Sequence, residues 1–186
     1  MLDALSNILT SFGLSASAGL NAYIPLLIVA LMARFTNLIH LNQPFDVLAN
    51  GWVIGVLVVL TAVEAVADKI PAVDTVYNIL QSLARPAAGA ILFAASSRVV
   101  TDVHPALALV CGLLVAGSVH AVKTVARPVI TAATGGVGNP VVSTAEDVVS
   151  GTVTLASILM PLLALVIIVI GIWLVLRPLR SDQAES

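Results

Sequence analysis

Charged residues and cysteine are scarce in this sequence, and their scarcity excludes several classes of protein. Only 10% of the 186 residues are charged, whereas a soluble domain carries roughly 25%. The net charge of −2 provides no basic surface for nucleic acid, so we expect no nucleic-acid partner. Cys111 is the single cysteine, which excludes an intrachain disulfide and a cysteine-based metal site.

Hydrophobic residues make up 59% of the chain and lie in long runs. Several runs approach or exceed the roughly 20 apolar residues needed to cross a bilayer. We therefore predict an all-α, polytopic membrane protein with about five spanning helices plus re-entrant or half-spanning segments. Residues 1–180 form a single integral membrane domain in this prediction, and residues 181–186 form a polar C-terminal tail. The lipid bilayer is its first expected partner.

Prolines, glycines and changes in polarity divide the chain into expected helices and breaks. The small residues of 15–23 predict a break in or near the membrane, and the glycine-rich stretch at 128–150 predicts another. Gly51 and Gly55 have the spacing that lets two helices approach closely. The expected helices cover residues 2–14, 24–35, 51–67, 72–85, 87–100, 105–126 and 152–176.

One order of segments recurs along the chain: a spanning helix, a charged end, a proline, a short or broken segment, and a returning helix. It is found in residues 51–100 and again in 105–176, with a shortened version in 2–35. Such internal repeats with interrupted helices are typical of small transporters and channels. Arg177 and Arg180 place the C-terminus in the cytoplasm, and the helix count then predicts that the repeats are parallel.

Ionisable side chains gather at the ends of two predicted spans. Glu64 and Asp68 are four residues apart and share a helix face. His120, Lys123 and Arg127 also share a face, so one unit presents acids where the other presents bases. A charge inside a membrane is costly unless it is paired, and the opposite signs make a paired layer reasonable.

The repeat also predicts which charges pair. We expect the acids of the unit at 51–100 to meet the bases of the unit at 105–176, and Arg85 to meet Glu146 or Asp147. The candidate binding or translocation residues are Asn21, Glu64, Asp68, Lys69, Asp74, Arg85, His120, Lys123, Arg127, Glu146 and Asp147.

These residues favour a small transporter or channel-like protein for an ion or small solute. The carboxylates would respond to protons or cations, and His120 would act as a switch near neutral pH. Lys123 and Arg127 would bind an anionic solute instead. So small a protein needs a partner copy to enclose a pathway, which predicts a homo-oligomer. No Ser–His–Asp order stands out, so we expect no catalytic residues and no enzyme.

Other interpretations remain open. The charges could only hold the repeats in register, as in a structural or assembly subunit of a membrane complex. A protein that handles a lipid phosphate such as polyprenyl phosphate would use the basic cluster. A metal site of His120 with Glu64, Glu146 or Asp147 is disfavoured by the basic residues nearby, and we expect no metal and no cofactor.

Several stretches resemble a family of bacterial membrane proteins catalogued as domain-of-unknown-function family 4126. They are SAGLNAYIPLLIVALMAR, VEAVADKIPAVDTVYN, LARPAAGA, HAVKTVARP and STAEDVVS. The resemblance covers most of residues 10–160 and includes the charged stretches. It implies an integral protein of the bacterial inner membrane and implies no activity.

Overall fold

The protein is built from α-helices. The computed structural model describes residues 2–67, 71–97, 102, 104–161, 163, 166–171 and 173. The regular structure within these ranges is helical, which confirms the predicted all-α class. The main helices are α1 (Leu2–Leu20), α2 (Tyr23–Phe35), the 3-10 helix η1 (Phe45–Ala49), α3 (Gly51–Ala67), α4 (Pro71–Ser96), α6 (Pro105–Thr134) and α7 (Asn139–Leu159).

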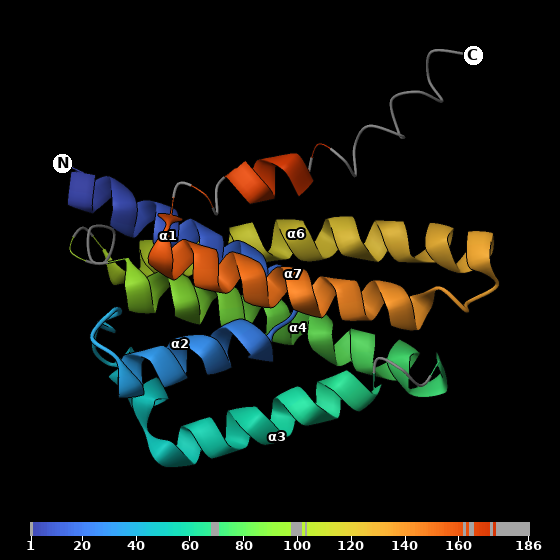
Figure 1. The fold of residues 1–186 in the computed structure, drawn as a ribbon, viewed down its shortest axis with the longest axis horizontal. Helices are drawn as coiled ribbons and strands as arrows, with labels where there is room; N and C mark the ends of the chain where they lie inside the picture. The colour runs from blue at the N-terminus through green and yellow to red at the C-terminus, as the bar shows by residue number, and fades with distance from the viewer. Residues whose placement is uncertain are drawn as a thin grey trace.

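The α-helices form consecutive hairpins that run in the same sense (Figure 1). Helices α1, α3 and α6 start at the end of the molecule where the N-terminus lies, and α2, α4 and α7 return toward it. Each of the units expected at 2–35, 51–100 and 105–176 holds one such hairpin. The α1–α2 hairpin is the shortest and turns back part-way along the bundle, whereas the other hairpins continue past its tip.

The break between α1 and α2 is narrower than the sequence suggests. Helix α1 continues through the serine-rich stretch to Leu20, and only Asn21 and Ala22 interrupt the helical path. Serine hydroxyls often compete with the backbone and end helices. Here the Ser17 hydroxyl donates to the Leu14 carbonyl, and the Ser15 hydroxyl donates to Gly112 of another helix. Because these hydroxyls have partners, the helix continues.

Prolines also interrupt the helices less than predicted. Pro86 lies inside α4 and Pro128 lies inside α6, so the expected breaks at these residues are wrong. Neighbouring helices can stabilise such sites, and the ring of Pro86 lies next to Gly117 of α6. The predicted start of the last helix, at residue 152, is also wrong. Residue 152 lies inside α7, which begins at Asn139 and ends before Pro161.

The turn between α6 and α7 depends on glycine. Gly135 and Gly136 have φ values of 61° and 86°, a left-handed conformation that costs side-chain-bearing residues energy. The Gly135 N–H and the Gly136 N–H both donate to the Thr131 carbonyl at the end of α6. This glycine pair ends α6 and lets α7 return along it.

Small residues let the helices of the core approach closely. Helix α1 packs against α4, α6 and α7. A Cβ at Gly112 of α6 would lie 2.6 Å from Cβ of Phe93 and 2.7 Å from Cα of Ala90, both in α4. Of the two glycines expected to allow a close approach, only Gly51 has a neighbour, because a Cβ there would lie 3.3 Å from a terminal nitrogen of Arg34 in α2, whereas nothing lies within 4 Å of a Cβ built at Gly55. Spacing alone did not distinguish the contacting glycines from this one.

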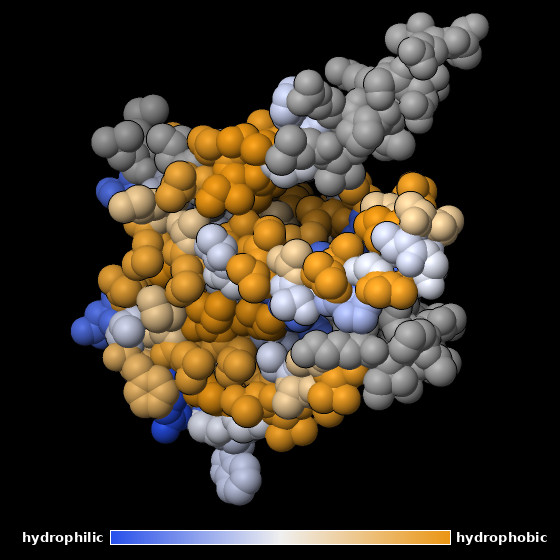
Figure 2. All heavy atoms as spheres, turned by 45° about the vertical axis from the view of Figure 1, so that its right-hand side comes forward, coloured by the Kyte–Doolittle hydropathy of each residue, from blue (hydrophilic) through white to orange (hydrophobic). Residues whose placement is uncertain are grey.

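Hydrophobic side chains cover much of the surface, as Figure 2 shows for one face. Helix α6 is long and apolar enough to cross a membrane, and only 17% of its most apolar window is buried in the structure. The core helix of a soluble protein would be mostly buried instead. Helices α2 and α3 are also apolar but shorter. Among the described residues, α6 alone meets the criteria of length and hydropathy for a span.

Candidate functional site

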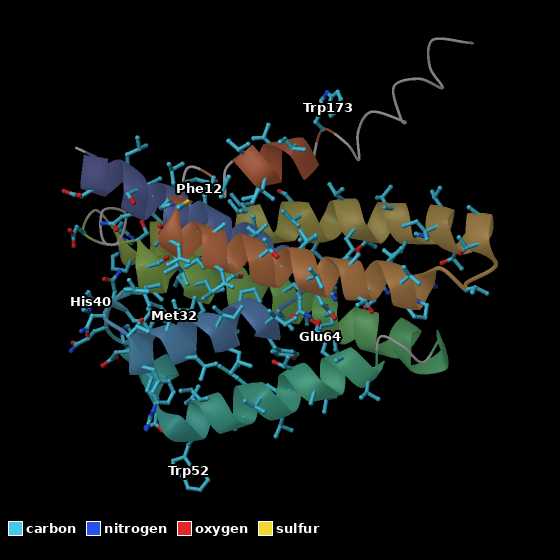
Figure 3. The ribbon with its side chains drawn as sticks, in the orientation of Figure 1. Phe12, Met32, His40, Trp52, Glu64 and Trp173 are labelled. Atoms are coloured by element: carbon cyan, nitrogen blue, oxygen red, sulfur yellow. The ribbon has the colours of Figure 1, made fainter. Side chains whose placement is uncertain are left out.

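Ionisable side chains from several helices meet at the level where α1 ends. Glu64 of α3 faces the rest of the bundle (Figure 3) and is fully buried, as is Arg85 of α4. A terminal nitrogen of Arg85 lies 3.4 Å from a Glu64 carboxylate oxygen, which makes a buried ion pair. We call the following residues the charged layer: Glu64, Arg85, His120, Lys123, Arg127, Glu146 and Asp147.

His120 joins the second hairpin to the third. Arg85 Nη1 lies 3.3 Å from His120 Nδ1. A guanidinium can only donate, so His120 Nδ1 accepts and carries no proton in this arrangement. The geometry therefore assigns His120 a neutral ring protonated at Nε2. The Arg85 side chain thus contacts an acid on α3 and an imidazole on α6.

Lys123 links α6 to α7 and to the end of α1. Its ammonium lies 2.6 Å from Glu146 Oε2 and donates to the Leu20 carbonyl at 3.0 Å. The last carbonyls of a helix lack partners within the helix, and a cation there also stabilises the negative end of its dipole. Arg127 Nη2 donates to the same Glu146 oxygen at 3.1 Å. One carboxylate therefore binds two cationic side chains.

Asn21 occupies the break between α1 and α2. Its side-chain oxygen accepts from the backbone N–H groups of Tyr23 and Ile24 at 3.0 and 2.9 Å, as an N-capping residue does. Its amide nitrogen donates to Asp147 Oδ1 at 2.9 Å. The broken hairpin is thereby fixed to the acidic residues of α7.

The structure brings the predicted charges together but pairs them differently. Arg85 pairs with Glu64 and not with Glu146 or Asp147, and Lys123 pairs with Glu146 and not with an acid of α3. Consecutive antiparallel helices bring residues of one hairpin to the same level, so Arg85 and Lys123 each meet an acid of their own hairpin. The expected exchange between hairpins was wrong for these pairs.

Three predicted site residues cannot be placed in the layer. Asp68 and Lys69 lie outside the described residues, and Asp74 belongs to α4 but its side chain lies outside the description. Their membership of the site stays a prediction.

Gln81 was not among the predicted site residues, although the structure places it beside the layer. It lies one helical turn before Arg85 on α4, and 1% of its surface is exposed. Within the described part of the chain, neither its amide nitrogen nor its amide oxygen has a hydrogen-bond partner, and Arg85 Nε has none either. Buried polar groups are almost always hydrogen-bonded. The i, i+4 spacing from Arg85 was the sequence signal available for finding it.

A second polar cluster lies along α1, and its role is packing. The Ser15 hydroxyl donates to the Gly112 carbonyl, Ser150 donates to the Ser17 carbonyl, and Thr154 donates to the Ser17 hydroxyl. We call Ser15, Ser17, Ser150 and Thr154 the hydroxyl seam. All four side chains are buried. Interhelical hydrogen bonds between small residues are a common way for apolar helices to associate.

An apolar groove borders the basic side of the layer. It has a volume of about 470 Å³ and lies between α1, α6, α7 and residues 167–171. Its walls are almost entirely apolar, and Lys123 and Glu146 are among the residues that line it. Ligand pockets commonly combine apolar walls with a few polar groups.

Comparison with known proteins identifies the family. A family model described as Domain of unknown function (DUF4126) matches residues 8–181. The chain belongs to this family. The match confirms the resemblance seen in the sequence, and it includes the three hairpins' connections and every residue of the charged layer. No curated protein and no solved structure matches the chain.

Proposed function

We propose that this DUF4126 protein is a small polytopic membrane transporter or channel-like protein, and that the charged layer is its solute site. The protein would act without catalysis or a cofactor, on an ion or small solute. The proposal rests on how the helix break and the charged layer meet inside an apolar bundle.

The proposed setting is the bacterial inner membrane, with about five spanning helices and the α1–α2 hairpin entering only part of the bilayer. Support comes from the length and exposure of α6 and from the apolar surface of its neighbours. Arg34 is exposed at the end of α2 away from the layer, and the C-terminal arginines favour the same, cytoplasmic side. The similar sense of the hairpins supports parallel repeats.

The observation that carries the proposal is the broken hairpin at the charged layer. Transporters commonly bind solutes and ions at interrupted helices, whose free ends offer unpaired N–H and carbonyl groups. Here polar side chains occupy such groups, since the Lys123 ammonium binds the Leu20 carbonyl at the end of α1, and Asn21 caps the N-terminus of α2 while contacting Asp147. The end of α1 and the start of α2 thus lie at the same level of the bundle as the acidic and basic side chains of the charged layer.

The cost of the layer also supports a role beyond packing. Ionised side chains at the centre of a membrane helix cost about 2.5–3.5 kcal/mol each on insertion scales. Replacing a buried ion pair by apolar residues is often neutral or stabilising. Hydroxyl groups like those of the seam could hold the helices together without burying charges. The buried charges are therefore better explained by the binding of a solute than by packing.

A pathway for a solute needs walls on all sides. Several faces of α3 and α6 expose apolar side chains that no other part of the described chain covers. We therefore include a homo-oligomer in the proposal, with lipid or a second copy against these faces.

Flux into sealed liposomes tests the proposal. Purified protein would be reconstituted and assayed with a panel of alkali cations, chloride, phosphate and small neutral solutes. We expect flux of at least one of these by the wild type. The double variant Glu64→Gln/Arg85→Met removes both charges of the buried pair and should abolish flux, whereas Thr154→Val in the hydroxyl seam should retain it.

Two results would contradict the proposal. Absence of flux by the folded wild type, or full flux by the folded double variant, would favour the structural or assembly subunit instead. In that case the layer would only hold the hairpins in register.

The apolar groove favours a second candidate, the handling of a lipid phosphate such as polyprenyl phosphate. Lys123 lies on the groove wall, where a chain could occupy the apolar part and a phosphate could approach the base. Binding of a long-chain prenyl phosphate, measured against the matching alcohol and against inorganic phosphate, tests it. Lys123→Met should abolish a preference for the prenyl phosphate, and equal binding of the alcohol would exclude this candidate.

A further inference from the structure

The second hairpin contains buried hydrogen-bonding groups that the fold does not use. Within the described residues, both polar atoms of the Gln81 amide and the Nε–H of Arg85 have no partner. The two side chains are one turn apart on α4 and are at least 99% buried. Residues at this spacing are neighbours on a helix surface. An unsatisfied buried polar group is costly, so three of them on one helix face need an explanation.

The charge of this position indicates the class of molecule it can bind. Glu64 and Arg85 carry opposite charges in one ion pair, and His120 is neutral because its Nδ1 accepts from Arg85. Gln81 carries no charge. A bare ion would therefore find no net countercharge among these described residues, and burying an unpaired ion is strongly unfavourable.

The unused groups define a specific pattern of hydrogen bonds. Arg85 Nε offers one donor, and the Gln81 amide offers two donors and one acceptor oxygen. A matching molecule accepts hydrogen bonds from the guanidinium and the amide nitrogen and donates one to the amide oxygen. Water, small polyols, urea and simple amides have this combination, whereas alkali cations and halides do not.

We infer that Gln81 and Arg85 Nε form the binding position for a small neutral solute that both donates and accepts hydrogen bonds. This inference rests on the proposed transport function and narrows its solute class. Arg85 has two roles in it, because its terminal nitrogens bind Glu64 and His120 while its Nε remains for the solute.

Osmotic swelling of proteoliposomes tests the inference. Stopped-flow light scattering would measure permeability to water, urea, glycerol and formamide, and potential-sensitive dyes would measure K⁺, Na⁺ and Cl⁻ flux. Gln81→Met removes the amide at nearly constant size. Gln43→Met makes the same change at an exposed position and serves as the matched control.

We expect the wild type to conduct at least one neutral solute and none of the ions. Gln81→Met should lower that permeability by about tenfold, since hydrogen bonds to the solute are lost, and Gln43→Met should leave it unchanged.

The melting temperature of Gln81→Met should not fall, because an unsatisfied amide is replaced by an apolar group. Gln81→Leu provides a second apolar variant if the methionine variant does not fold. The separate responses to water and to the organic solutes identify which neutral molecule the position selects.

Three outcomes would overturn the inference, and they are distinguishable from a failure of the proposed function. Ion flux without neutral-solute flux would leave the transport proposal intact and exclude the neutral solute. Unchanged neutral permeability in folded Gln81→Met would exclude Gln81 as the binding position. Absence of all flux in the wild type would remove the transport function itself, and this inference with it.

Discussion

The hydroxyl seam and the charged layer are both buried and polar, yet they satisfy their hydrogen bonds to different degrees. In the seam, the hydroxyls of Ser15, Ser17, Ser150 and Thr154 each donate to a defined acceptor at 2.7–3.0 Å. At the layer, ion pairs coexist with the Gln81 amide and the Arg85 Nε, which have no hydrogen-bond partner among the residues that the structure describes. The hydroxyls of the seam are used in packing, whereas the layer has polar groups beside it that the described part of the chain leaves unpaired, and under the proposed function these groups bind the solute.

The difference follows from the chemistry of the side chains. A serine hydroxyl can bond to a backbone carbonyl of its own or a neighbouring helix at small cost in space. A guanidinium has five donors in a fixed plane, and a single carboxylate and one imidazole do not use them all. Hydroxyls are therefore sufficient for cohesion between helices, and the charged layer is the place where the proposed function puts the solute.

Removal of one charge from the buried pair gives the largest expected effect. Arg85→Met leaves Glu64 without its guanidinium and should lower the free energy of unfolding by about 3–5 kcal/mol. The double variant with Glu64→Gln should recover most of this loss. Unfolding in mixed micelles, followed by circular dichroism, measures both. Arg34→Met is the control, since Arg34 is exposed and its loss, which removes an exposed hydrogen bond to the Ala49 carbonyl, should have an effect below about 1 kcal/mol. A double variant no more stable than Arg85→Met would show that the pair is not the main source of the loss.

A methyl group at the closest helix contact should have the next largest effect. Gly112→Ala places a Cβ against Phe93 and Ala90. Such overpacking should lower the free energy of unfolding by about 1–3 kcal/mol. Gly55→Ala meets nothing within 4 Å and should be neutral or slightly stabilising, since alanine favours a helix. Melting temperatures in one detergent compare the two. Equal effects would contradict the close packing of α4 and α6.

Single hydrogen bonds in the seam should give the smallest effect. Thr154→Val removes the bond to the Ser17 hydroxyl together with the bond to the Ser150 carbonyl of its own helix, and the loss of the seam bond should cost about 0.5–1.5 kcal/mol. Thr152→Val is the matched control on the same helix, because its exposed hydroxyl bonds only to Val148 within that helix. Both should leave flux unchanged. A loss of flux in folded Thr154→Val would extend the solute site into the seam and remove the distinction drawn between the two regions.

The sequence predicted the helical class and all seven members of the charged layer, because charges within apolar helices stand out and their spacing places them on one face. Glu64, His120 and Lys123 were identified on this basis. Pairing could not be predicted, since it depends on the register of antiparallel helices. Gln81 escaped notice because a glutamine in an amphipathic stretch is usually solvent-exposed, and only tertiary packing buries it. The contact at Gly112 could not be predicted from the sequence, because it depends on which helix face meets a neighbour.

The predicted helix breaks at prolines were the other systematic error. Pro86 and Pro128 would end helices in water, where the freed carbonyls and the clash of the ring favour a break. Both lie within continuous helices here. Both prolines lie in helices of a bundle whose neighbouring helices can stabilise such sites, and this tertiary contribution cannot be read from the local sequence.

Access of water to the charged layer is the most direct test of its proposed role. In a Cys111→Ala background, which has no other cysteine, His120→Cys would report on the layer and Val110→Cys on the exposed apolar face of α6. A membrane-impermeant thiol reagent would be added to the protein in sealed proteoliposomes. A solute site predicts that the cysteine at position 120 reacts and that the one at position 110 does not. A cysteine at position 120 as unreactive as that at 110 would show that water does not reach the layer, and would contradict the account.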